Sequence, residues 1–263
     1  MAGIEFDEKA ARQIETAYST PDIVAQRASV LSMLKLRPGE HVLDIGVGPG
    51  FLAAEMAAEV GAGGRVCGID VSDNMLAVAA LRDTGPEAAA IELARGDAEE
   101  IPYGDGTFDV VVSTQVLEYV PDVPGALAEM YRVLKPGGRA LILDTDWASL
   151  VWHAPDEELM RRVLDAWEEH LVDPHLPRTL GRSLVRAGFQ SGPPTVLPLL
   201  NAGNPRGSFS GSLLELVSGF VVDRHGLDRE TVDAWVASMR ALDADWFFSL
   251  NRYVFLATRP LDG

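Results

Sequence analysis

The chain has 263 residues, of which 47% are hydrophobic, and its 39 acidic and 22 basic side chains give a formal net charge of −17 at pH 7. This length and composition allow one substantial core, or a core with a cap. The acidity argues against nucleic acid and anionic membranes as partners, because neither half of the chain has a basic patch. The single cysteine, Cys67, excludes an internal disulfide and a cysteine-based metal site.

The first elements expected along the chain are two helices, over 5–17 and 22–35. Thr20-Pro21-Asp22 introduces the second helix and Pro38-Gly39 follows it, and both are typical boundary patterns. Strands and helices then alternate, which predicts a parallel sheet with helices on both faces. The expected strands are 41–45, 65–70, 90–95, 108–113 and 139–145, and the intervening helices are 51–60, 73–82 and 123–134.

The pattern changes after the fifth strand. Helices are expected over 156–172 and 177–188, and strands over 194–200 and 252–259. The connection between these last two strands has about fifty residues, with a Gly-, Asn- and Ser-rich loop followed by two helices. A connection of this kind is usually a lid, a binding cap or an oligomer surface. We expect a single domain with an N-terminal helical cap (1–37), a cofactor-binding core (38–150) and a substrate-side half (151–263) that contains a helical insertion over about 201–250.

The segment 42–50, Val-Leu-Asp-Ile-Gly-Val-Gly-Pro-Gly, places a short buried strand before a glycine turn and an alanine-rich helix. These three parts form a cradle for a nucleotide-like ligand. Phe51 stands where dinucleotide folds carry a third glycine, and no P-loop lysine is present. Asp44 at the mouth of the turn repels phosphate, so the segment favours a cationic or hydroxyl-bearing ligand. Ligands bind such sheets at the carboxyl ends of the strands, and four polar residues fall at or just beyond predicted strand ends: Asp44, Asp70, Asp97 and Gln115.

Four segments, in this order, resemble the class I methyltransferases that use S-adenosylmethionine. Asp44-Ile-Gly-Val-Gly-Pro-Gly is similar to their motif I, and Gly68-Ile69-Asp70 is similar to the ribose-binding end of their second strand. Gly96-Asp97-Ala98-Glu99 resembles the adenine-binding segment, and Leu134-Lys135-Pro136-Gly137-Gly138 resembles the turn before the fifth strand. The nearest resemblance is to bacterial small-molecule methyltransferases of the ubiquinone/menaquinone-biosynthesis-like group. It implies a Rossmann-like, seven-stranded, mostly parallel α/β sheet with helices on both faces, N-terminal helices and a helical insertion before the last strand.

The resemblance also implies S-adenosylmethionine as the cofactor. Asp70 would accept hydrogen bonds from the ribose hydroxyls, Asp97 from the adenine amine, and Asp44 would face the methionine ammonium. Arg27 would pair with the methionine carboxylate. Structural alternatives stay open, with Asp70 as a helix N-cap, Asp97 as a turn residue and Arg27 as a solvent-exposed helix residue. The residues expected at the cofactor are Tyr18, Arg27, Asp44, Gly46, Gly48, Gly50, Asp70, Val71, Met75, Asp97, Ala98 and Gln115.

Methyl transfer from a sulfonium is an in-line displacement, so catalysis comes mostly from bringing the nucleophile and the methyl group together away from water. A general base is needed only if the acceptor must lose a proton. His153 is the first candidate for this base, followed by His170 and His175, and each has the alternative of a surface or hydrogen-bonded loop residue. The scattered histidines form no expected metal cluster.

The expected function is transfer of a methyl group to a small-molecule acceptor, with oxygen or nitrogen favoured as the acceptor atom and carbon left open. The alternatives are a non-catalytic S-adenosylmethionine- or nucleoside-binding protein and an NAD-dependent oxidoreductase. A homodimer formed through the insertion is a further option. The first residues lack a signal-peptide pattern and no stretch reaches the roughly 18 apolar residues of a membrane span. We therefore expect a cytoplasmic, bacterial enzyme with no nucleic-acid or membrane partner.

Overall fold

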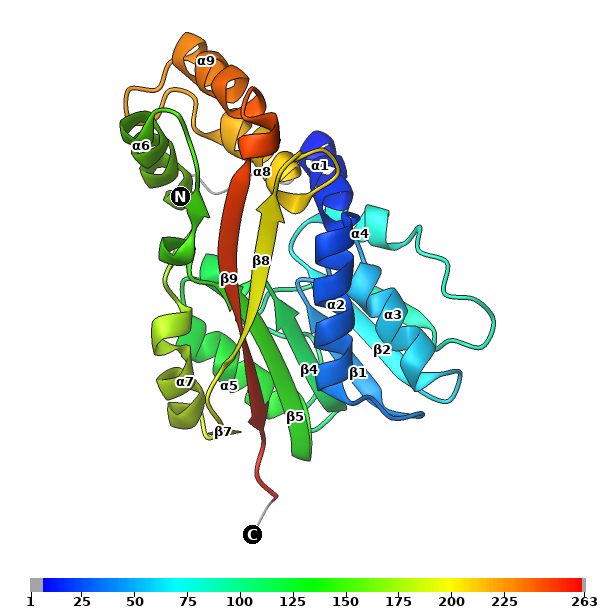
Figure 1. Ribbon diagram of the computed structural model, residues 1–263. Coiled ribbons are helices and arrows are strands. Elements are labelled where there is room, and N and C mark those ends of the chain that lie inside the picture. The colour runs from blue at the N-terminus through cyan, green and yellow to red at the C-terminus, as the bar shows by residue number, and fades with distance from the viewer. Residues whose placement is uncertain (1–6, 262–263) are drawn as a thin grey trace.

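The computed structural model describes residues 7–261, which form a nine-stranded sheet with helices on both faces (Figure 1). The strand order is β3-β2-β1-β4-β5-β9-β6, and β7 and β8 also pair with β9. Strands β1 to β5 are parallel, whereas β9 runs antiparallel to all its partners. The strands are β1 (His41–Ile45), β2 (Arg65–Asp70), β3 (Ile91–Arg95), β4 (Phe108–Thr114), β5 (Leu134–Thr145), β6 (Val151–Trp152), β7 (Gln190–Ser191), β8 (Thr195–Ala202) and β9 (Phe247–Thr258).

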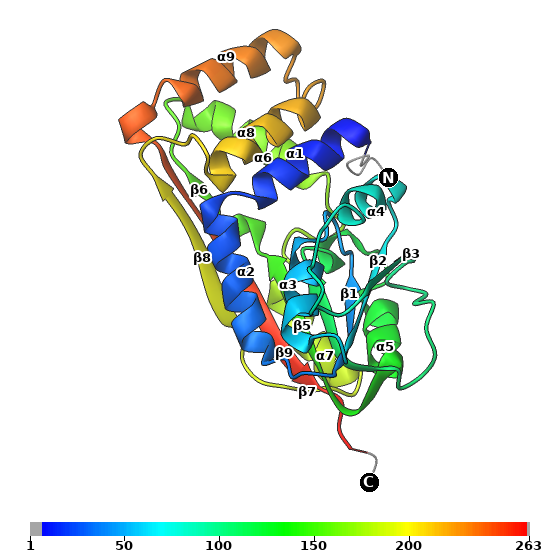
Figure 2. The ribbon, with the colours of Figure 1, turned by 90° about the vertical axis from the view of Figure 1, so that its right-hand side faces the viewer.

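The helices form a layer on each face of the sheet and a separate group at one end (Figure 2). Helices α2 and α3 cover one face, α5 and α7 cover the other, and α6, α8 and α9 gather at the end where α1 also lies. None of the helices within residues 7–261 is both long enough and apolar enough to cross a membrane. The helices are α1 (Glu8–Tyr18), α2 (Pro21–Leu34), α3 (Phe51–Val60), α4 (Asp73–Ala79), α5 (Val123–Val133), α6 (Glu157–Glu168), α7 (Pro177–Arg186), α8 (Phe209–Phe220) and α9 (Arg229–Arg240).

The central strands are apolar on both sides because helices cover both sides. Val42 on β1 packs into the cluster formed with α2 and α3, and its neighbour Leu43 packs into the cluster formed with α5 and α7. Both side chains are fully buried. This two-sided burial is typical of parallel sheets and explains why the strands were recognisable as short apolar runs.

The predicted fold class is confirmed, with differences at the ends of elements. The strand predicted over 41–45 and the helix predicted over 51–60 have the expected bounds. The two strands beyond the predicted seven, β6 and β7, have two residues each and both pair with β9. Residues 5 and 6 of the first predicted helix lie outside the described residues.

Strand β5 begins five residues before its predicted start, at Leu134 rather than at residue 139, and the last strand also begins five residues early, at Phe247 rather than at residue 252. The five additional residues of β9 extend past the end of β5 and pair with β6 and β8. Their side chains alternate, with Phe248 and Leu250 buried and Phe247 exposed. Burial of every second side chain is typical of a half-buried strand. The sequence pattern was therefore sufficient to predict the longer strand.

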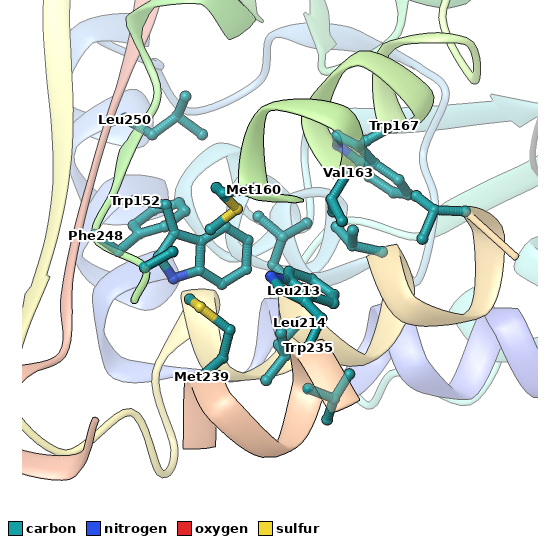
Figure 3. Packing of buried hydrophobic residues seen from close by; sticks show 14 of the residues in the cluster. Trp152, Met160, Val163, Trp167, Leu213, Leu214, Trp235, Met239, Phe248 and Leu250 are labelled. Carbon is teal, nitrogen blue, oxygen red and sulfur yellow. The ribbon is translucent and has the colours of Figure 1, made fainter. Parts of the chain in front are cut away.

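Residues 147–172 and 199–250 build a second core beyond the end of the sheet, which we call the cap core (Figure 3). It contains all five tryptophans of the chain, and the rings of Trp152 and Trp235 meet at a centroid distance of 6.2 Å. Helices α1 and α2 contribute Ala17 and Ile23 to the same cluster. The predicted insertion is therefore packed with the N-terminal helices, and the tryptophans make fluorescence a reporter of the cap core.

Replacing Leu214 of α8 with alanine should lower the free energy of unfolding by about 2–5 kcal/mol, because it opens a cavity in a packed core. Leu214 is 2% exposed, whereas Leu200 on β8 is 60% exposed and provides the matched control. Leu200→Ala should change the free energy by no more than about 0.5 kcal/mol. Urea unfolding followed by tryptophan fluorescence measures both values, and similar losses for the two variants would contradict the assignment of the cap core.

Candidate functional site

A cavity of about 360 Å³ lies at the carboxyl ends of β1, β2 and β4, beneath α1, α2 and α8. Sheets of this type bind ligands at this edge, where the strand order reverses on either side of β1. Eleven of the twelve residues expected at the cofactor line the cavity: Tyr18, Arg27, Asp44, Gly46, Gly48, Asp70, Val71, Met75, Asp97, Ala98 and Gln115. The twelfth, Gly50, does not line it. The assignment of each residue to a part of the cofactor stays a prediction.

The glycine turn after β1 needs its glycines for two different reasons. Gly46 has a φ of +66°, and a Cβ there would lie 2.3 Å from Cγ2 of Val116. Gly50 has a φ of +80°, and a Cβ there would lie 2.9 Å from Cα of Ala79. Gly46 therefore gives the turn its close approach to the segment after β4. Gly50 permits helix α3 to start against α4, which is a packing role rather than the expected contact with the cofactor.

Asp70, at the end of β2, already has two backbone partners. One carboxylate oxygen accepts a hydrogen bond from the amide of Gly48 at 2.9 Å, and the other accepts from the amide of Ser72 at 2.9 Å. Burial raises the pKa of Asp70 and these backbone donors oppose that rise. The N-cap of α4 is Ser72 and not Asp70, since the Ser72 hydroxyl accepts from the amide of Met75. Asp70 thus ties the glycine turn to β2 and also presents its carboxylate to the cavity.

Asp97 lies at the exposed rim of the cavity. One of its oxygens accepts a hydrogen bond from the amide of Glu99 at 2.9 Å. Asp97 therefore also stabilises a turn, which was the alternative role considered from the sequence. Val71 is 53% exposed although it is apolar, while Met75 is 3% exposed. An exposed apolar side chain beside a buried one offers a flat ligand a surface to cover.

Asp44 is a buried carboxyl at the end of β1 that lines the cavity. It is 2% exposed, and its Oδ1 has no hydrogen-bond partner within the described part of the chain. Burial raises the pKa of Asp44 to about 8, and the nearby charge of Asp70 adds to the rise. A buried carboxyl without a partner is costly unless a ligand supplies one, and a cation does so most effectively.

Gln115 holds a strained position immediately after β4. Its φ is +59°, a conformation that costs a residue other than glycine about 1–3 kcal/mol. Its backbone amide donates to the carbonyl of Leu143, and its Oε1 accepts from the hydroxyl of Thr145 at 2.8 Å. These bonds leave Nε2 buried with no partner among residues 7–261, so the cavity has an amide donor ready for a ligand.

Arg27 and Tyr18 come from the N-terminal helices. The Arg27 guanidinium donates to Glu55 at 3.0 Å and to the backbone carbonyl of Tyr18 at 2.6 Å, and it lies over the ring of Phe51. Arg27 is neither a solvent-exposed helix residue nor an unpaired cation. Its pairing with Glu55 leaves less capacity for the expected contact with a methionine carboxylate.

The other end of the cavity is aromatic and contains His170. Trp147, Trp167 and Phe209 line it, and the His170 ring lies 3.8 Å from the Trp167 ring between centroids. Nδ1 of His170 contacts the carbonyl of Trp167, and because a carbonyl only accepts hydrogen bonds, Nδ1 carries the proton. Burial lowers the pKa of His170 to about 4, so the ring is neutral near pH 7. Its Nε2 is then a buried lone pair with no partner within residues 7–261.

The other two candidate histidines lie elsewhere. His153 is exposed, and it lines a second cavity together with Trp152 and Phe247. His175 contacts Oδ1 of Asp146 at 3.1 Å and does not line the first cavity. The structure therefore does not support His153 as the first candidate for the general base. It lies close in sequence to the end of β5, but β6 carries it away from the cofactor edge.

Two charged residues that sequence reasoning missed also line the cavity. Glu118 is 1% exposed and accepts a hydrogen bond from Nε1 of Trp147 at 3.1 Å, and burial raises the pKa of its carboxyl. Arg252 of β9 is 3% exposed. Glu118 lies within the mostly apolar segment Val-Leu-Glu-Tyr-Val, and Arg252 lies within the mostly apolar segment Leu-Asn-Arg-Tyr-Val. A charged residue inside such a segment is the sequence signal that would have identified both.

No group of three His, Cys, Asp or Glu side chains within residues 7–261 is arranged to hold a metal ion. The polar groups that line the cavity include carboxylates, an amide, a neutral imidazole and the guanidinium of Arg252, which forms no ion pair within residues 7–261.

The chain is similar in sequence to known methyltransferases. Residues 43–142 match the family described as "Methyltransferase domain". A demethylmenaquinone methyltransferase of Bacillus mycoides is 38% identical over 127 residues, which cover 48% of this chain and 54% of that protein. An uncharacterised 37.1 kDa protein of a Streptomyces fradiae transposon is 39% identical over 185 residues, 69% of this chain and 52% of that protein. The chain thus spans about half the length of these relatives.

The fold also matches a solved enzyme. Phosphoethanolamine N-methyltransferase 2 of Haemonchus contortus, solved with phosphomonomethylethanolamine and S-adenosylhomocysteine, superposes with a TM-score of 0.61 and 24% identity. The match covers 97% of this chain and 58% of that one. Residues 43–142 therefore form a class I S-adenosylmethionine-dependent methyltransferase domain. The family predicted from the four sequence segments is confirmed, and the two alternatives receive no support.

Replacing Asp70 with alanine should weaken S-adenosylhomocysteine binding by about 1–3 kcal/mol, the value of hydrogen bonds to a charged group. Asp73 is the matched control, since it lies three residues along, is 73% exposed in its side chain and pairs with Arg95 on the surface. Asp73→Ala should bind as the wild type does. Calorimetry gives both affinities, and an unchanged affinity in Asp70→Ala would exclude the ribose role.

A second prediction concerns pH. Because the pKa of Asp44 is raised to about 8, its carboxyl is protonated in the free protein near neutral pH. Pairing with the cofactor ammonium requires the charged form, so binding releases a proton. S-adenosylhomocysteine affinity should therefore rise between about pH 6 and pH 8, by up to about tenfold per unit.

Calorimetry in buffers of different ionisation enthalpy counts the released proton. Asp44→Asn has no carboxyl to titrate and should lose most of this pH dependence. An equal pH slope in the variant and the wild type would show that Asp44 does not face the ammonium.

Proposed function

We propose that the protein transfers the methyl group of S-adenosylmethionine to a small molecule with an apolar body, bound at the aromatic end of the cavity. One observation carries the proposal. The carboxylates at the ends of β1 and β2 and the aromatic group around His170 line the same cavity. A cavity that served only to bind the nucleoside would not need a second, apolar end of this kind.

The cap supplies the dry surroundings that the reaction requires. S-adenosylmethionine supplies a methyl carbon on a sulfonium, and its displacement is favoured where the nucleophile is held in line without competing water. Phe209, Leu213 and Leu216 of α8 line the cavity from above, and Trp147 and Trp167 line its aromatic end. The insertion thus contributes directly to the site. The homodimer remains a prediction, as does the cytoplasmic location.

His170 orients the acceptor in this proposal. Its Nε2 lone pair accepts a hydrogen bond from a hydroxyl and so directs an oxygen lone pair toward the methyl carbon. A methylated hydroxyl is an oxonium, which is a much stronger acid than an imidazolium whose pKa is about 4, so His170 can remove its proton. An alkylated amine is a far weaker acid and would keep its proton. The lowered pKa therefore favours oxygen over nitrogen as the acceptor atom.

The proposed activity is tested by incubating the protein with methyl-labelled S-adenosylmethionine and a bacterial metabolite extract, followed by identification of the labelled product. A labelled small molecule with a new methyl ether or ester supports the proposal. Cofactor binding without any labelled product would favour a binding protein instead.

His170→Phe should lower the turnover of that acceptor by about 100-fold or more and leave S-adenosylhomocysteine affinity unchanged, because phenylalanine keeps the ring packing and removes the lone pair. His153→Phe is the matched control, since His153 is exposed and outside the cavity. Steady-state kinetics of both variants separate turnover from binding. Full activity in His170→Phe would assign the residue to packing only.

A further inference from the structure

Arg252 is a buried cation that lines the cavity, and it forms no ion pair with any residue in the part of the chain that the structure describes. It lies within β9, opposite Thr145 of β5 and Leu197 of β8. Its Nη1 donates to Oε1 of Gln26 at 2.9 Å, and its guanidinium lies 4.8 Å from the ring centroid of Phe209. Its Nε has no partner in the described part of the chain.

The acidic groups near Arg252 do not neutralise it by contact. Glu118 and Asp22 both act on the Arg252 guanidinium electrostatically, yet neither forms an ion pair with it in the described structure. The Glu118 carboxylate accepts from Trp147, and the Asp22 carboxylate accepts from Asn201 and from the amide of Phe209. Burial lowers the pKa of Arg252, which is the electrostatic cost of removing the guanidinium from water. A bound anion would offset this cost.

The position of Arg252 separates it from the cofactor carboxylates. The sheet order β2-β1-β4-β5-β9 places Arg252 three strands from Asp44 and four from Asp70. At a strand spacing of about 4.8 Å, the backbone at Arg252 is about 14 Å from that of Asp44 across the sheet. The adenosine edge at Asp70 therefore lies on the far side of the cavity from the strand that carries Arg252, and we assign an anion at Arg252 to the acceptor.

The surroundings of Arg252 define the rest of the ligand. Phe209 and Leu213 line the cavity from α8, and Trp147 and Trp167 line the side of His170. Gln26 and Phe209 contact the guanidinium from two directions, which fixes its orientation for a bidentate contact with an oxyanion.

We propose that the methyl acceptor carries an anionic group, a carboxylate or a phosphate, which binds the Arg252 guanidinium while an aromatic or similarly apolar body lies between Phe209 and the His170 end. This inference rests on the proposed function, because it assigns the acceptor to the same cavity. It makes Arg252 a binding residue for the acceptor and gives it no part in binding the adenosine.

The test uses benzoate, benzamide and phenyl phosphate as probes of the protein saturated with S-adenosylhomocysteine. Benzoate and benzamide share size and shape and differ in charge. Benzoate should bind tighter than benzamide by about tenfold or more, the effect of a charge-assisted hydrogen bond. Tighter binding of phenyl phosphate than of benzoate would identify a phosphate as the anionic group, and the reverse order would identify a carboxylate. Calorimetry or quenching of the cap tryptophans reports each affinity.

The Arg252→Gln variant should lose the preference for benzoate and retain S-adenosylhomocysteine binding. Arg178→Gln should keep the preference, since Arg178 is a half-exposed arginine that pairs with Asp146 outside the cavity. Equal affinity of the wild type for benzoate and benzamide overturns the inference without any variant, as does failure of benzoate to bind. A preference that persists in a folded Arg252→Gln protein also overturns it.

These outcomes are distinguishable from failure of the proposed function. Benzoate tests the anion site by binding alone, whereas the labelled-methyl experiment tests transfer. A labelled product retained on an anion exchanger agrees with the inference. A neutral or cationic labelled product would leave the methyltransferase function intact and contradict the role of Arg252.

Discussion

The burial of polar atoms without partners is the constraint on which the site depends. Asp44 Oδ1, Gln115 Nε2, His170 Nε2 and Arg252 Nε all lack hydrogen-bond partners within residues 7–261, and all four residues line one cavity. Each such atom costs about 1–3 kcal/mol relative to a bonded one. Because these four atoms line a cavity, a ligand bound there removes the cost, and their positions and types outline the ligand that we propose: a cation at Asp44, an acceptor group at Gln115, a donor at His170 and an anion at Arg252.

Two parts of the fold, the parallel sheet and the cap core, position these atoms, and the two parts share strand β9. The parallel strands place Asp44 and Asp70 at the sheet edge, and the cap core places His170 and Phe209 above it. Strand β9 belongs to both, because it pairs with β5 in the sheet and with β6 and β8 in the cap. Arg252 lies where β9 passes from one to the other, which makes the acceptor end of the cavity sensitive to how the cap sits on the sheet.

The sequence identified most of the strand-end residues that line the cavity because this part of the site is local. The strand, the glycine turn and the helix over 41–60 are adjacent in the chain, and the residues at strand ends follow from the parallel order. The acceptor half is built from distant segments. His170 follows α6, Glu118 follows β4 and Arg252 lies in β9, so only tertiary packing brings them together. Arg252 was missed because the last strand was predicted to start at it, which made an interior residue look like an exposed end. His153 was preferred over His170 because it is closer in sequence to β5, although β6 leads away from the cavity.

A crystal structure of the protein with S-adenosylhomocysteine tests the central claim most directly. The account predicts the ribose at Asp70, the ammonium at Asp44 and the sulfur directed toward the aromatic end that contains His170. A ligand bound at the second cavity beside Trp152 and His153, or one whose sulfur points away from His170 and Arg252, would contradict it.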